Sequence, residues 1–289
     1  MKNFFFKAAL FLTMPLMAAS FVSCDDDDTP PPAPQFKSEL IGTYTPTFIN
    51  YQLPMAESAQ DYYFIIEPTW KEGVKPETLM VGGFLPMPQV LGIMQGLVSN
   101  IIMGGFVELD LKNNGSFSAK YKSLILPENA DMSAIMGALL EPKFEETVKV
   151  FPSLETEAVI PAAALGYYTD DNADKFYFTI SKDFLKMVGE KMEQPTNLVE
   201  LIEGVIASSS LDIQSTEKYF AIPLKYTVES KGALTLYIDL GMIKPYLPLI
   251  KAAVANVPPI MNMINLKDTI DLIFNNVSEL KMKLLLQKK

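Results

Sequence analysis

One stretch of the chain has oxygen-bearing side chains at a spacing typical of metal-binding loops. Asp170, Asn172 and Asp174 match the first three ligand positions of a calcium-binding loop, which needs clustered oxygen ligands. Such a loop also needs a glycine at its sixth position and a glutamate at its twelfth, where this chain has Lys175 and Ser181. We therefore interpret this stretch as a polar hairpin tip and predict no metal ion.

Carboxylate pairs are a second arrangement with potential chemistry, because two carboxyl groups can together hydrolyse a glycosidic bond. Glu108 and Asp110 alternate along a predicted strand, and further pairs occur within residues 145–146 and 155–157. Nothing in the sequence marks any of these groups as removed from water. Solvated faces explain them best, and a carboxylate-based hydrolase is a remote alternative.

The composition excludes several other kinds of site. The chain has no histidine and no arginine, and Cys24 is its only cysteine. Triads that depend on histidine, and zinc or iron sites with histidine ligands, are therefore excluded. The net charge of -10 argues against nucleic acid as a partner, because phosphate binding depends on basic surfaces. We predict a protein that is not an enzyme and that needs no cofactor.

The N-terminus has the pattern of a bacterial export signal. A basic start precedes an apolar run over residues 4–17, which is too short and too interrupted to span a bilayer as a helix. The sequence Phe21-Val22-Ser23-Cys24 then resembles the lipobox of bacterial lipoproteins. The resemblance implies that residues 1–23 are a signal peptide, and that Cys24 carries the lipid that anchors the chain to a membrane.

Residues 24–35 are expected to form the tether between the lipid and the body. Asp25 to Asp28 resemble the acidic export signal of Bacteroidetes lipoproteins that are carried to the outer face of the outer membrane. This resemblance implies surface exposure, and a tether that faces the periplasm is the alternative. The proline-rich residues 29–34 predict a stiff, extended spacer.

Alternating apolar and polar residues predict several β-hairpins in the body, residues 36–289. The clearest has Asn114-Gly115 as its turn, since both residues tolerate positive φ. The other predicted strands and hairpins cover residues 39–45, 62–67 (ended by Pro68), 165–180, 219–240 and 280–287. We expect a single globular domain, and two similar halves with a boundary near residues 150–160 are the alternative.

Helical spacing of apolar residues predicts three almost uncharged helices, over residues 88–103, 132–140 and 243–257. Methionine, which adapts to irregular apolar shapes, is frequent in and around them. A soft core is one interpretation, and an apolar pocket between these helices and a sheet is the other. The predicted lining of that pocket consists of Met87, Leu91, Met94, Val98, Ile135, Met136 and Leu249.

Aromatic residues suggest a different site. Tyr62, Tyr63 and Trp70 could form a stacking platform for sugar rings on the surface. Packing of these rings into the core or against a hairpin is the simpler explanation.

The opening of the body, Leu40-Ile41-Gly42-Thr43-Tyr44, resembles that of lipocalin-like (calycin-like) proteins, in which a glycine shortly before an aromatic residue starts a barrel. The hairpin segment Asn114-Gly115-Ser116-Phe117 also resembles strands in lipocalin-like lipoproteins of Bacteroidetes. The long apolar helices depart from a simple up-and-down barrel. We therefore predict a β-dominated α+β fold whose antiparallel hairpins form a barrel-like or strongly curved sheet covered by apolar helices.

These features favour a lipoprotein of the outer membrane that binds a hydrophobic small molecule without transforming it. A lipid, a fatty acid, a sterol or a bile-acid-like molecule would suit the predicted apolar pocket. Capture of a glycan or a protein through exposed aromatic residues is the alternative function.

Overall fold

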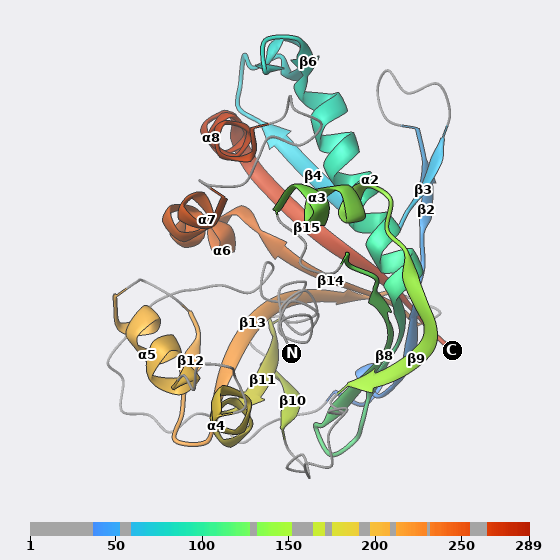
Figure 1. Ribbon diagram of the computed structural model, residues 1–289, viewed down its shortest axis with the longest axis vertical. Coiled ribbons are helices and arrows are strands. Elements are labelled where there is room, and N and C mark those ends of the chain that lie inside the picture. The colour runs from blue at the N-terminus through green and yellow to red at the C-terminus, as the bar shows by residue number, and fades with distance from the viewer. Residues whose placement is uncertain are drawn as a thin grey trace.

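The computed structural model describes residues 37–52, 59–127, 132–151, 164–170, 175–190, 197–208, 212–229, 232–254 and 265–289. The predicted signal peptide, Cys24 and the tether lie outside the described residues, as do residues 171–174 of the calcium-like stretch. The described part of the chain is a strand-dominated α+β protein with a large antiparallel sheet (Figure 1). None of its described helices is long and apolar enough to cross a membrane.

One sheet of eleven strands forms the body. Its strands are β1 (Gly42–Pro46), β4 (Phe64–Trp70), β7 (Phe106–Leu111), β8 (Phe117–Leu124), β9 (Phe144–Phe151), β10 (Leu165–Asp170), β11 (Lys175–Ser181), β12 (Gln214–Ser215), β13 (Tyr219–Val228), β14 (Ala233–Asp239) and β15 (Val277–Lys288). The order is β10-β11-β13-β14-β15-β1-β7-β8-β9, with β4 paired to β15 and β12 paired to β13. Two small hairpins stand apart, β2 (Ile49–Tyr51) with β3 (Gln60–Tyr62) and β5 (Met80–Val81) with β6 (Leu85–Pro86).

The helices lie between these strands in the sequence. They are α2 (Met87–Gly105), α3 (Met132–Leu140), α4 (Lys182–Glu190), α5 (Leu198–Ser208), α6 (Leu240–Ile243), α7 (Leu247–Val254) and α8 (Leu266–Asn276), with short 3₁₀ turns η1 (Ser38–Leu40), η2 (Pro76–Thr78) and η3 (Lys244–Tyr246). The predicted helices over 88–103 and 132–140 are confirmed. The predicted helix over 243–257 is instead divided into η3 and α7, because Pro245 and Pro248 favour the first turn of a new helix.

The sheet is strongly curved, and its described strands do not close into a barrel (Figure 1). β10 approaches the turn between β7 and β8, where Gly166 bridges Ser116 and the Tyr167 amide donates to the Gly115 carbonyl over 2.7 Å. Strands from both sides of residues 150–160 join the same sheet, since β15 pairs with β1 and β4 as well as with β14.

The two faces of the sheet differ in polarity because side chains alternate along each strand. On β14, Leu234, Leu236 and Ile238 are buried, while Tyr237 and Asp239 point to the other face. The register opposes Leu236 to apolar residues of β13 and β15. The apolar face packs into one hydrophobic core, and part of the opposite face carries the charged residues described below.

Helix α2 packs against the outer edge of β4 (Figure 1). The Ser99 hydroxyl accepts hydrogen bonds from the Tyr63 and Phe64 amides, and the Gln95 side chain accepts one from the Ile66 amide. The prediction that Pro68 ends this strand is wrong, since β4 continues to Trp70. Backbone N–H groups two residues apart on a strand point in the same direction, so the nitrogen of Pro68 faces α2, as that of Ile66 does. Proline has no N–H, but this position makes no backbone hydrogen bond to β15, so the strand can continue.

Candidate binding cleft

The four neighbouring strands β11, β13, β14 and β15 place charged residues on the polar face of the sheet. The register opposes Lys175 to Lys225 across β11 and β13, and it opposes Asp239 to Lys281 across β14 and β15. These residues come from positions far apart in the sequence. Antiparallel pairing brings them together because directly opposed residues point to the same face.

A cleft of about 670 Å³ lies over this charged part of the sheet. Its floor comes from the four strands, and its wall comes from α6 and η3, which directly follow β14. The lining consists of Lys175, Asp212, Pro223, Lys225, Asp239, Leu240, Gly241, Met242, Lys244, Tyr246, Ser278, Glu279, Leu280 and Lys281. Apolar and charged side chains therefore share one concave surface.

Two of the lysines in the cleft are neutralised by carboxylates. Lys175 donates to Asp212 over 2.9 Å, and Lys225 forms an ion pair with Asp239. Burial opposes the charged form of Lys175, but the hydrogen bond and negative charge of Asp212 and the contacts with Tyr177 together outweigh this effect and raise the pKa of Lys175. Lys175 therefore remains charged at neutral pH.

Asp239 fixes the wall of the cleft to its floor. Its carboxylate binds Lys225 and accepts a hydrogen bond from the Met242 amide over 3.0 Å, so Asp239 is the N-cap of α6. Burial opposes ionisation, but these two hydrogen bonds lower the pKa of Asp239 below its ordinary value. The carboxylate is thus held ionised while it positions α6.

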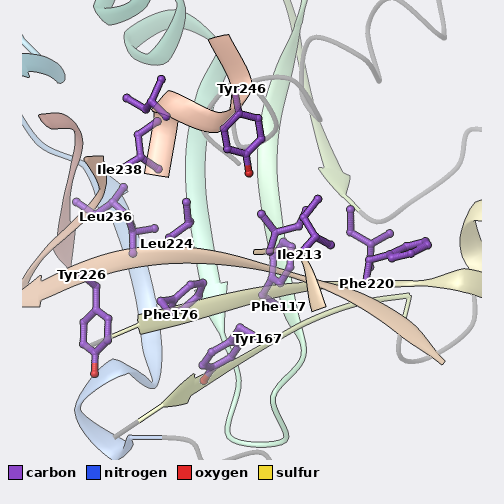
Figure 2. Packing of buried hydrophobic residues seen from close by; sticks show 14 of the residues in the cluster. Phe117, Tyr167, Phe176, Ile213, Phe220, Leu224, Tyr226, Leu236, Ile238 and Tyr246 are labelled. Carbon is purple, nitrogen blue, oxygen red and sulfur yellow. The ribbon is translucent and has the colours of Figure 1, made fainter. Parts of the chain in front are cut away.

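Tyr246 closes one side of the cleft. Its ring lies on the opposite side of the β13 strand from Tyr226 and Tyr167, with its hydroxyl directed toward that strand (Figure 2). Burial raises the pKa of Tyr246 well above its usual range, and the negative charge of Asp212 adds to this effect. The hydroxyl is consequently protonated at any physiological pH and can donate a hydrogen bond.

The structure does not place the predicted pocket residues at this cleft. Met87 is 0 % exposed and Leu91 is buried, and both belong to the main hydrophobic core, while Met94 and Val98 are half-buried. The side chains of Ile135, Met136 and Leu249 lie outside the described residues. The described part of the α2 face therefore packs against protein.

The predicted aromatic platform is divided in the structure. Tyr62 is only 2 % exposed, and Trp70 packs against the core. Tyr63 is half-buried, and its ring lies 5.5 Å from that of Phe48, which is 48 % exposed. Of the three rings of the predicted platform, only that of Tyr63 is left to form a surface pair, and its partner is Phe48.

Glu108, Asp110 and residues 145–146 lie outside the cleft, and the pair within 155–157 lies outside the described residues. Glu108 forms ion pairs with Lys120 at 2.6 Å and Lys289 at 2.5 Å, and these hydrogen bonds lower the pKa of Glu108. Asp110 accepts a hydrogen bond from Thr43. In the described ranges, no group of three or more acidic or cysteine side chains could hold a metal ion. These residues act as cross-strand contacts of a solvated sheet face.

The residues of the cleft were not found by sequence reasoning. Lys281 and Lys283 do alternate with apolar residues along the predicted closing strand, but the same alternation occurs on any half-exposed strand. The long hairpin of β13 and β14 ends at Asp239-Leu240-Gly241, and an aspartate before a helix is a recognisable N-cap signal. That signal could have located the wall of the cleft.

No family model, curated protein or solved structure matches this chain.

Proposed function

We propose that this chain is a membrane-tethered protein that binds a hydrophobic or amphiphilic small molecule without transforming it. The main support is the mixed lining of the cleft, in which the apolar residues Pro223, Leu240 and Met242 lie beside charged side chains. Sites for small molecules usually have volumes of about 300–1,000 Å³ and combine an apolar lining with a few polar groups. Lipids, fatty acids, sterols and bile-acid-like molecules belong to the class that such a cleft suits.

The carboxylates of the cleft support a function in binding without hydrolysis. A hydrolase of the two-carboxylate type needs one carboxyl group that is protonated and can act as an acid. Asp212 and Asp239 each bind a lysine, and the pKa of Asp239 is lowered. The Asp239 carboxylate is therefore not suited to donate a proton at neutral pH.

The proposed position of the protein is the outer membrane, with the lipid on Cys24 as its anchor. The lipobox-like residues 21–24 and the acidic run at 25–28 support display on the cell surface, and the periplasmic face is the alternative. Each buried methylene contributes about 0.8 kcal/mol, so two or three acyl chains hold such a tether stably. A cleft on a tethered body would meet small molecules that arrive from outside the membrane.

Binding of decanoate and 1-decanol to residues 25–289, which include every described element, tests the proposal. Isothermal titration calorimetry should show saturable binding that Met242→Asp weakens by at least tenfold, because a charge would enter the apolar wall. Met103→Asp is the matched control, since Met103 is 59 % exposed and lies on α2 outside the cleft. Absence of binding by either probe, or equal effects of the two substitutions, would reject the cleft as the site.

Capture of a glycan or protein remains the alternative function, favoured by the exposed ring of Phe48 beside the half-buried ring of Tyr63. Exposed rings stack on sugars and contact protein partners at low entropic cost. Retention of the chain on immobilised polysaccharide, lost in Phe48→Ser and kept in Met242→Asp, would favour this alternative over the cleft.

A further inference from the structure

We infer that the ligand of the cleft carries an acidic group, which Lys244 and Lys281 bind, and this inference rests on the proposed function. The cleft has four lysines and three acidic residues, whereas the whole chain has a formal net charge of -10. An excess of positive charge at one concave surface of an acidic protein points to an anionic ligand.

The pairing within the cleft identifies the lysines that are available. Lys175 and Lys225 are occupied by Asp212 and Asp239. Within the described residues, neither Lys244 nor Lys281 forms an ion pair. These two ammonium groups are the cationic donors of the cleft that an incoming anion can reach without breaking a bond to a carboxylate.

The register explains why Lys281 lacks an ion pair even though carboxylates flank it. It opposes Asp239 on β14 and Glu67 on β4. Asp239 is bound by Lys225 and the Met242 amide, and Glu67 is bound by Lys283 at 2.5 Å. Both neighbouring carboxylates therefore already have a cation, while the half-buried Lys281 keeps three N–H donors for a ligand.

Glu279 is the remaining charged group, and it limits which anions the cleft accepts. It is solvent-exposed and forms no ion pair among the described residues. Its charge adds repulsion that a single carboxylate or sulfonate can avoid more easily than a multiply charged phosphate. The apolar wall of Leu240 and Met242 then contacts the rest of the molecule, so the ligand is a monoanionic amphiphile.

Matched probes test this inference separately from the proposed function. Decanoate and 1-decanol have the same chain length, and decyltrimethylammonium supplies the opposite charge. A charge-assisted hydrogen bond is worth about tenfold in affinity. At pH 7.5 the unmodified chain should therefore bind decanoate at least tenfold more tightly than 1-decanol, and the cation more weakly than either.

The double variant Lys244→Met/Lys281→Met should lose this preference and retain 1-decanol affinity within about threefold. Lys120→Met is the control, because Lys120 lies outside the cleft and is paired with Glu108. Equal affinity of the unmodified chain for decanoate and 1-decanol would overturn the inference and leave the proposed function standing. A preference that survives the double variant would also overturn it, whereas failure of both probes would reject the proposed function itself.

Discussion

Asp239 gives the sharpest prediction about the cleft, because two different contacts converge on one carboxylate. It caps α6 through the Met242 amide and pairs with Lys225. Loss of an N-cap costs about 0.5–2 kcal/mol, whereas a partly exposed ion pair contributes about 0–1 kcal/mol. Asp239→Ala should therefore lower the free energy of unfolding by about 0.5–3 kcal/mol.

Asp239→Asn separates the two contacts. Asparagine caps helices as well as aspartate does but has no charge, so this variant should lose only the ion pair, about 0.5–1 kcal/mol at pH 7. Lys225→Met should produce a similar loss, because it removes the other partner of the same pair. Urea unfolding followed by the fluorescence of Trp70, the only tryptophan, measures all three variants.

The pH dependence provides an independent check on the same carboxylate. The pKa of Asp239 is lower in the folded chain than in the unfolded chain. Its contribution is therefore fully present above the ordinary aspartate pKa of about 4 and is lost as the pH falls through the folded value. The difference between wild type and Asp239→Asn should shrink below about pH 4. Equal losses for Asp239→Asn and Asp239→Ala, or a difference that does not change with pH, would refute this account.

Three further predictions concern α2 and the tether. Ser99→Ala leaves two part-buried amides without an acceptor and should cost about 1–3 kcal/mol in urea unfolding, while the exposed Asn100→Ala on the same helix should cost nothing. Gly104→Ala would place a Cβ in steric conflict with the Phe144 ring and should lower the melting temperature, whereas Gly96→Ala meets open space and should raise it through helix propensity. Cys24→Ala should move the chain from the membrane fraction to the soluble fraction, and continued sedimentation with membranes would reject the lipid anchor.

The sequence was a good guide to local structure because turn and cap signals act over a few residues. Asn114-Gly115 marks a hairpin turn that appears where expected, with Gly115 at a φ of 75°. The prediction that Pro68 ends its strand was wrong because it took no account of the neighbouring helix α2. Pro68 continues its strand because its edge faces side chains of α2 instead of another strand.

The candidate site could not be predicted for a related reason, since it depends on pairing between distant strands. Lys225 and Lys281 reach one cleft because β13, β14 and β15 are neighbours in a fixed register, and a shift by one residue would move each lysine to the apolar face. Burial of Leu236 and Leu284 on that opposite face specifies the register. The same apolar residues that hold the sheet together therefore decide which lysines face the ligand, so the charge pattern of the cleft follows from the packing of the core.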